Sequence, residues 1–322
     1  MADWTGVDGK RVVITGATAG IGLAAAEALA ARGARLTIVA RSEARAAEAA
    51  RRIEAAGHGG AVDTLIAELS AQSSVRRLAA QLLERYPRID VLVNNAGTMN
   101  VKRRLTDDGV ELTWAVNHLA PFLLTNVLLE RIKASTPARI VTTASGAHNG
   151  AEIPFDDVGA EHSYGFGGRR YSQTKLANIL FTVELARRLE GTGVSANCFH
   201  PGVVATGLAR NNGALARAAT TIAKPFLRSP AKGAETLVWL LDSPGQRPER
   251  RLFRGLPADG AQRASAGPRR GPPPVGAERG AGRHAVTGRG SGVRCLLGVR
   301  ALHGAGQAGG RSRAGRGARA RA

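Results

Sequence analysis

Tyr171 and Lys175 lie four residues apart in a segment with a helical pattern. Side chains at that spacing share one face of a helix, so the phenol and the ammonium point to the same side. A free phenol titrates at about pH 10, but a nearby cation stabilises the phenolate and so lowers the pKa of the phenol. The pair therefore predicts a general acid/base that works near neutral pH. Tyr164 is a competing phenol, but the residue four positions after it is Gly168.

Ser145 and Asn117 are two polar residues that can join this chemistry. Ser145 follows a predicted strand at 139–143, where a hydroxyl at the carboxyl end faces the ligand cleft. Asn117 lies in a helical segment at 107–133, and Pro121 can open the helix near it. A polar side chain beside a freed carbonyl can hold a water. The alternative, which the sequence alone favours, is an ordinary interior Asn.

A glycine-rich turn at 15–22 (TGATAGIG) joins the first predicted strand to the first predicted helix. Gly16, Gly20 and Gly22 let the backbone turn sharply and approach a pyrophosphate, which sits on the helix N-terminus. The alternative is a plain tight turn between a strand and a helix. The strand before it and the helix after it favour a dinucleotide site.

The end of the second predicted strand indicates which dinucleotide is bound. An acidic residue there would bind the ribose 2′-hydroxyl of NAD, but this chain has Ala40 followed by Arg41. Because a guanidinium suits a 2′-phosphate, the sequence favours NADP(H) over NAD(H). The alternative is that Arg41 is one more surface arginine at a helix start.

Two further loops follow predicted strands. The segment 94–97 (NNAG) offers amide and small side chains that can bond neighbouring loops and leave room for a flat ligand. The loop that starts at His200 contains a Pro201-Gly202 turn, which can shape the nicotinamide end of a site, and Thr206, which could bond an amide. Either loop could instead be an ordinary turn.

These motifs need a sheet that brings the ends of its strands together. Short apolar, β-branched runs alternate with longer helix-patterned segments, which predicts right-handed crossovers and an α/β fold with helices on both faces of a parallel sheet. The predicted strands are 11–15, 35–39, 61–66, 89–93, 139–143 and 194–199. The predicted helices are 20–31, 43–56, 73–86, 107–133, 169–190 and 231–241. Ligands bind at the carboxyl edge of such sheets.

The charge of the chain separates it into two parts. All 322 residues together carry a formal charge of +20, which taken alone suggests a nucleic-acid binder. Residues 243–322 hold 17 Arg, three acids and no Lys, which leaves +6 for residues 1–242. The first part is therefore a mildly basic chain, long enough for one α/β domain with a single core.

Composition also narrows the class of protein. Two Cys exclude a disulfide framework, and no Cys/His cluster has zinc spacing, so we expect no metal. The N-terminus lacks the apolar region of a signal peptide. The apolar runs fall short of the roughly 18–20 residues that a membrane span needs. We therefore expect a soluble cytoplasmic protein.

Together the motifs resemble the short-chain dehydrogenase/reductase family, in the family's order, from about residue 8 to 242. Segments 172–191, 116–124 and 139–148 look closer still to its retinol-dehydrogenase-like branch, which includes the WW-domain oxidoreductase and protochlorophyllide reductase relatives. The spacing of 26 residues between Ser145 and Tyr171 agrees with that branch. The resemblance implies a Rossmann-type doubly wound sheet of strand order 3-2-1-4-5-6, with a seventh strand in doubt.

The resemblance also implies an NAD(P)-dependent oxidoreductase for an alcohol or carbonyl substrate of lipophilic character, in a possible homo-oligomer. Tyr171 would exchange a proton with the substrate oxygen, which Ser145 holds. Lys175 would lower the Tyr171 pKa and bond the nicotinamide ribose, and Asn117 would keep a water in the proton relay. An alternative is a nucleotide-bound protein without turnover.

Cofactor contacts are implied at the ends of several strands. Glu68 stands where the family usually has Asp beside the adenine, so we expect that contact to be shifted by one methylene. The implied cofactor-binding residues are Thr15, Gly16, Thr18, Gly20, Ile21, Gly22, Arg41, Glu68, Leu69, Asn95, Ala96, Gly97, Tyr171, Lys175, Pro201, Gly202, Val204 and Thr206.

The tail, residues 243–322, shows no strand alternation or helical period, and 260–322 have the composition of disorder. The tail could bind polyanions, or it could be an inert extension. A third alternative is that a GC-rich gene is translated out of frame after about residue 243. Because Phe253 is its only aromatic, nucleic-acid binding is not expected. The shifted frame is favoured, because a GC-rich gene translated out of frame yields Arg, Gly, Ala and Pro and avoids Lys. Without a seventh strand, the sixth would be an exposed edge.

Overall fold

The computed structural model describes residues 3–57, 60–204, 227–244 and 252–254. All of them belong to the first of two compact units, Met1–Arg269. Thr206 and residues 255–322 lie outside the described part of the chain.

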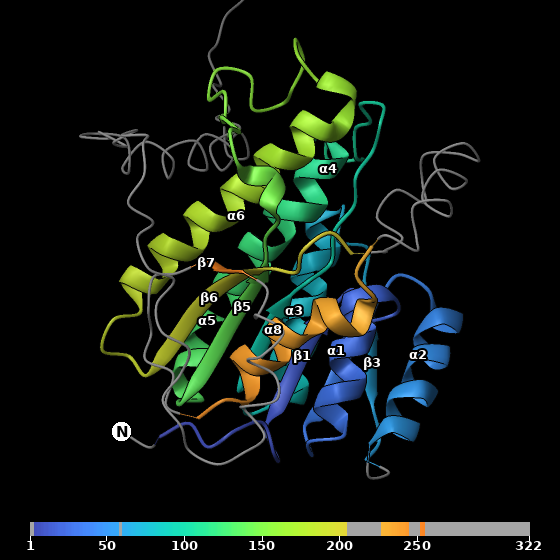
Figure 1. Cartoon of the computed structure of the whole chain (residues 1–322), viewed down its shortest axis with the longest axis vertical. Helices are drawn as coiled ribbons and strands as arrows, with labels where there is room; N and C mark the ends of the chain where they lie inside the picture. Colours follow the sequence, from blue (N-terminus) through green and yellow to red (C-terminus); the bar gives the residue numbers. More distant parts are fainter. Residues whose placement is uncertain (1–2, 58–59, 205–226, 245–251, 255–322) are drawn as a thin grey trace, which may run out of the picture. The chain divides into compact units, whose positions relative to one another are not determined.

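The described residues form a parallel sheet of seven strands in the order β3-β2-β1-β4-β5-β6-β7 (Figure 1). The predicted α/β class and the order 3-2-1-4-5-6 are confirmed. The central strands are buried on both faces and are mostly apolar or β-branched; every residue of β4 and β5 is buried. The strands are β1 (Arg11–Thr15), β2 (Arg35–Ala40), β3 (Asp63–Ile66), β4 (Val91–Asn94), β5 (Ala138–Thr143), β6 (Val194–His200) and β7 (Leu252–Arg254).

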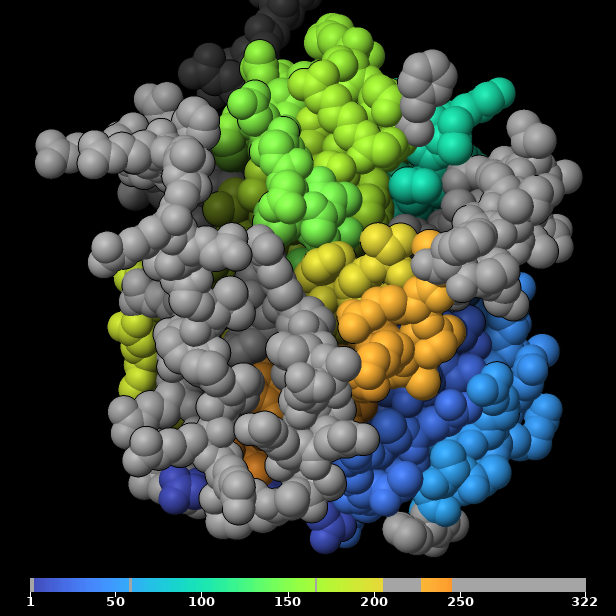
Figure 2. All heavy atoms as spheres, in the orientation of Figure 1, coloured from blue at the N-terminus to red at the C-terminus, as the bar shows by residue number. Residues whose placement is uncertain are grey.

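Helices cover both faces of the sheet. One core contains side chains of α1 (Gly20–Ala30), α2 (Glu43–Ala56) and α8 (Pro230–Asp242) packed on β1 and β2. Figure 2 shows α8 lying against α1 on this face. The second core contains α3 (Gln72–Arg85), α5 (Ala120–Ala134) and α6 (Gly168–Arg188).

The seventh strand, which the sequence left in doubt, is present as the three residues Leu252–Arg254. They pair in parallel with Cys198–His200 of β6. The edge of β6 is therefore covered over these residues, contrary to the exposed edge expected without a seventh strand. Leu252 and Phe253 are apolar neighbours in the sequence, but a strand of three residues is too short to carry a detectable alternation. The shifted reading frame stays a prediction.

The helix that carries Asn117 is not regular. Leu112–Trp114 form α4, Ala115–Leu119 form a π-helical turn (η1), and α5 follows from Ala120 with Pro121 in its first turn. The predicted opening of the helix near Asn117 is confirmed, because a π turn is a local break in the α-helical hydrogen-bond pattern.

Residues Leu112–Ala134 together are long and apolar enough to cross a membrane by length and composition, which differs from the expectation from apolar runs. Half of the most apolar window is buried inside the fold. Leu124, Leu128 and Ile132 belong to the core that covers the sheet. In this fold the segment is a core helix.

Candidate active site

The loops after β1 and β4 are tied together at the carboxyl edge of the sheet. The Thr15 hydroxyl accepts from the backbone N–H groups of Asn95 and Ala96 at 3.0 and 3.1 Å. The Asn95 amide donates back to the carbonyls of Thr15 and Gly16 at 3.2 and 3.1 Å. The Thr143 hydroxyl, from the end of β5, donates to Asn95 Oδ1 at 3.3 Å. The Asn95 side chain thus connects the loop after β4 to the loop after β1 and to the end of β5.

The glycine turn leaves no room for side chains. Gly16 has φ +70°, and a Cβ on it would lie 2.7 Å from the Cα of Ala96. A Cβ on Gly22 would lie 2.4 Å from Asn95 Nδ2. The residue before α1, Ala19, provides no side-chain cap, and the first turn has no acid, so the helix presents its N-terminal N–H groups to an anion.

Beside this turn, Leu69, Ala96 and Val116 are among the residues that line a cavity. The glycine cradle (Gly16, Gly20 and Gly22) beside the uncapped N-terminus of α1 suits the pyrophosphate of a dinucleotide, and the cavity lies next to it. The residues therefore fit the cofactor that the sequence predicts. Thr18 and Gly97 stand in the same two loops, and Gly20 and Ile21 are the first residues of α1.

Arg41 and Glu68, which follow β2 and β3, are both exposed at the carboxyl edge of the sheet. Arg41 follows β2 directly and its side chain is exposed. Glu68 is also exposed, and its Oε1 accepts from the N–H of Ser70 at 3.0 Å. The Glu68 carboxylate thus caps its own loop, whereas Leu69 is buried against the cavity.

The loop after β6 is held by Arg228. Its guanidinium donates to the Pro201 carbonyl at 3.4 Å, and Gly202 has φ +83°, which favours glycine. Val204 forms a bridge with Arg228 and lies against Gly233 of α8. The structure places Pro201, Gly202 and Val204 at the carboxyl edge with the other predicted cofactor residues, whereas Thr206 lies outside the described residues.

Ser145 and Tyr171 meet across the site. Burial raises the pKa of the Tyr171 phenol, and a hydrogen bond from the Ser145 hydroxyl opposes that shift. The N–H of Ala147 donates to Ser145 Oγ at 3.2 Å. That bond uses one lone pair of Oγ and leaves the serine hydrogen free to donate.

Lys175 lies one helical turn from Tyr171 on α6. Its Nζ donates to the Thr143 carbonyl at 2.8 Å and lies 5.5 Å from the centroid of the Tyr171 ring. Burial lowers the pKa of Lys175 to about 8, so the ammonium still predominates at neutral pH. Burial raises the pKa of Tyr171, and Lys175 is not among the groups that shift it in this structure, so the lowering of that pKa by Lys175 stays a prediction.

Asn117 is buried within the π turn, and its side chain is fully occupied. Its Oδ1 accepts from the Thr98 N–H at 2.7 Å, and its Nδ2 donates to the Thr98 carbonyl at 2.9 Å and to Thr174 Oγ1 at 3.1 Å. Its own carbonyl accepts from Asn178 Nδ2 at 2.8 Å. The side chain thus fixes the loop after β4 to the helix of Tyr171 and Lys175. This is the role of an interior Asn as well as of a site residue.

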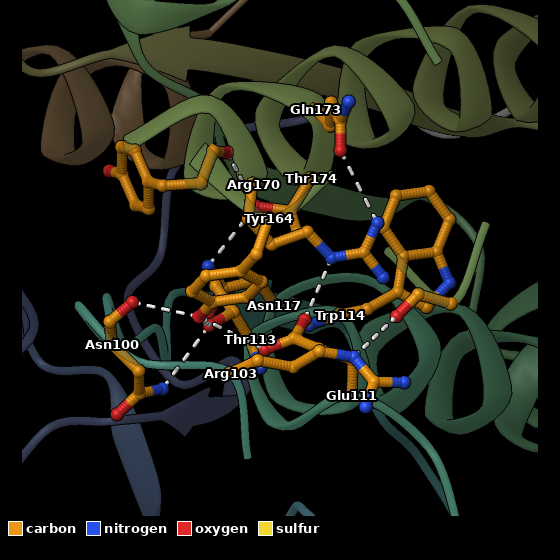
Figure 3. A network of polar contacts seen from close by, with 12 residues as sticks. Asn100, Arg103, Glu111, Thr113, Trp114, Asn117, Tyr164, Arg170, Gln173 and Thr174 are labelled. Carbon is orange, nitrogen blue, oxygen red and sulfur yellow. Dashed lines mark hydrogen bonds and ion pairs between the residues drawn. The ribbon is translucent and has the colours of Figure 1, made fainter. Parts of the chain in front are cut away.

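The sequence did not single out a buried ion pair beside the site, shown in Figure 3. Arg170 Nε lies 2.7 Å from Glu111 Oε2, and both side chains are at most 1% exposed. Glu111 also accepts from the N–H groups of Thr113 and Trp114, and the Arg170 guanidinium stacks over the Trp114 ring at 4.5 Å.

The same pair holds the segment between Ser145 and Tyr171. Arg170 Nη2 donates to the Val158 carbonyl at 2.6 Å. The Tyr164 hydroxyl, 3.3 Å from Glu111 Oε1, donates to the Asn100 carbonyl at 2.7 Å (Figure 3). Tyr164, the competing phenol, is therefore a structural residue of this network. The one available signal was that Arg170 adjoins Tyr171 in the sequence.

Comparisons with known proteins agree with this geometry. A family model described as short chain dehydrogenase matches residues 10–215. Retinol dehydrogenase 14 of Mus musculus is 44% identical over 249 residues, 73% of this chain and 74% of that protein. Retinol dehydrogenase 12 of Homo sapiens is 43% identical over 228 residues, 71% of this chain and 72% of that protein.

Among solved structures, a short chain dehydrogenase from Burkholderia cenocepacia in complex with NADP is 28% identical, with a TM-score of 0.61, and the match covers 77% of this chain and 96% of that one. The Pseudomonas aeruginosa RhlG/NADP complex is 26% identical, with a TM-score of 0.61, over 79% and 97% of the two chains. The chain belongs to the short-chain dehydrogenase family, in its retinol-dehydrogenase-like branch, and is an oxidoreductase that acts on alcohol or carbonyl groups.

Proposed function

We propose that this protein transfers a hydride between NADP(H) and a lipophilic alcohol or carbonyl compound, with Tyr171 as the general acid/base. The observation that carries the proposal is the convergence of Ser145, Tyr171 and Lys175 beside the glycine cradle. Ser145 hydrogen-bonds the Tyr171 phenol, and Lys175 lies one turn along the same helix face. A bound nicotinamide supplies or accepts the hydride.

The side chains supply the proton and the binding of the substrate oxygen. The raised pKa keeps the Tyr171 phenol protonated at neutral pH, so it can donate its proton to a carbonyl oxygen during reduction. The Ser145 hydroxyl, with its oxygen held by the Ala147 N–H, can turn its hydrogen to the same substrate oxygen. Lys175 keeps a positive charge within reach of the phenolate left behind.

NADP(H) is favoured over NAD(H) because β2 ends in Ala40 and not in an acid, and the exposed Arg41 follows it directly. The NADP complexes of the two neighbouring structures support this. Arg41→Ala should weaken NADPH binding by about 10- to 100-fold, as loss of a charge-assisted hydrogen bond would, and leave NADH binding unchanged. Fluorescence titration of both cofactors measures this.

Arg51→Ala is the matched control for Arg41→Ala, because Arg51 is also exposed but lies further along α2. It should leave both affinities unchanged. Equal losses for NADPH and NADH in Arg41→Ala would contradict a 2′-phosphate contact.

A lipophilic substrate is supported by apolar side chains on the loops after β4, β5 and β6. Val101, Phe155 and Val203 are 40%, 64% and 71% exposed. The relatives named retinol dehydrogenases support the same class of substrate. With NADPH, kcat/KM for straight-chain aldehydes should rise with chain length, by about fourfold per buried methylene. A flat or falling dependence would contradict a lipophilic substrate.

Three other expectations stay predictions from the sequence. They are a domain boundary at residue 242, a cytoplasmic location, and a homo-oligomer. Strand β7 lies after that boundary in the sequence.

A further inference from the structure

His200, the last residue of β6, contacts the turn that carries Ser145. Its Nδ1 accepts from the backbone N–H of Gly146 at 3.0 Å. The N–H of Gly202, two residues further along its own chain segment, lies 3.4 Å from the same nitrogen. The imidazole therefore joins the end of β5 to the Pro201-Gly202 turn.

The ring also packs closely on Gly146. A Cβ on this glycine would lie 2.9 Å from His200 Nε2 and 3.2 Å from Cε1. Gly146 has no positive φ, so it is the ring, and not the backbone conformation, that leaves no room for a side chain here. The imidazole thus both packs against Gly146 and accepts its hydrogen bond.

The carbonyl of the Ser145–Gly146 peptide is held by a second histidine, His148. His148 Nδ1 lies 2.6 Å from the Ser145 carbonyl oxygen, and its backbone N–H lies 3.2 Å from that oxygen. The C=O of the Ser145–Gly146 peptide therefore contacts His148, and its N–H contacts His200. A peptide bonded on both sides cannot rotate freely, and the Cα of Ser145 is one end of it.

The chemistry of this contact fixes the state of the ring. A backbone N–H can only donate, so Nδ1 of His200 must be the unprotonated nitrogen, and the neutral ring carries its hydrogen on Nε2. An acceptor is required at this position, and an apolar side chain of similar size would leave the Gly146 N–H without its bond.

We propose that His200 is a positioning residue for Ser145: through the Gly146 N–H it sets the orientation of the serine relative to Tyr171. This inference rests on the proposed function, since Ser145 is taken to hold the substrate oxygen. His200 itself acts through Ser145 and is not proposed to touch the substrate.

The test uses the full chain and two variants of His200. His200→Leu removes the acceptor, whereas in His200→Asn the amide oxygen can take the place of Nδ1. His200→Leu should lower kcat/KM for NADPH-dependent aldehyde reduction by about ten-fold, the effect of one unsatisfied donor, and His200→Asn should recover most of it. Equal losses in both variants at equal thermal stability would overturn the proposal.

A double-mutant cycle separates positioning of Ser145 from a general structural role. In a Ser145→Ala background, His200→Leu should change kcat/KM by less than about two-fold, because residues that act as a unit are not additive. The same ten-fold loss in that background would overturn the proposal.

A spectroscopic measurement keeps the test independent of turnover. The ¹⁵N spectrum of His200 should show an unprotonated, hydrogen-bonded Nδ1, and a protonated Nδ1 would overturn the inference. If the unmodified chain reduces no carbonyl while this spectrum is as expected, the proposed function fails and the placement of His200 stands.

Discussion

Tyr171→Phe should lower kcat/KM for carbonyl reduction by about 10²- to 10⁴-fold, the range that a positioned general acid contributes. Phe removes only the hydroxyl, which is the group that receives the Ser145 hydrogen bond. The glycine cradle and Arg41 are untouched, so most of the NADPH affinity should remain. Steady-state kinetics and a fluorescence titration with NADPH check the two halves of this prediction.

Tyr164→Phe is the matched control, because Tyr164 is the other phenol near the site. Its hydroxyl donates to the Asn100 carbonyl, so the substitution should cost stability, by about 1 kcal/mol, and leave most of the turnover. The assignment of the acid to Tyr171 would be wrong if Tyr164→Phe abolished turnover and Tyr171→Phe did not.

Arg170→Met should lower the free energy of unfolding by about 3–5 kcal/mol, because it leaves the Glu111 carboxylate buried without its cation. The side chains of this pair are 1% and 0% exposed, so water cannot replace the lost partner. Met keeps much of the volume over the Trp114 ring, which separates the loss of charge from the loss of packing. Urea unfolding of the full chain measures the difference.

Arg187→Met is the control on the same helix. Arg187 and Glu184 also form an ion pair, at 2.8 Å, but their side chains are 56% and 41% exposed. Exposed pairs contribute little, so this variant should unfold almost like the unmodified chain. Similar losses of stability for Arg170→Met and Arg187→Met would contradict a special role of the buried pair.

The sheet and most of the site could be predicted from local patterns. Most residues of the buried strands are apolar or β-branched, and the helix at Glu43–Ala56 has the bounds that its apolar spacing predicts. The glycine turn and Asn95 lie together because carboxyl ends of parallel strands share one edge. Pro121 correctly indicated the opening of the helix near Asn117, although not that the opening is a π turn.

What the sequence could not show depends on contacts between distant segments. Glu111 and Arg170 are 59 residues apart, so no helical or strand spacing connects them. His200 was noted only as the start of a loop, because its contact with Gly146 spans 54 residues. The burial that raises the pKa of Tyr171 is also a tertiary property, whereas the i,i+4 spacing indicated only the nearby charge of Lys175.

The central claim is that this chain moves a hydride between a nicotinamide cofactor and a carbonyl carbon at the site of Ser145, Tyr171 and Lys175. The most direct measurement is a single turnover of a medium-chain aldehyde with NADPH deuterated at the transferring carbon, followed by mass analysis of the product. The account predicts an alcohol with one deuterium on the carbinol carbon, formed far more slowly by Tyr171→Phe. Unlabelled alcohol, or no alcohol with any aldehyde or ketone while NADPH binds, would contradict it.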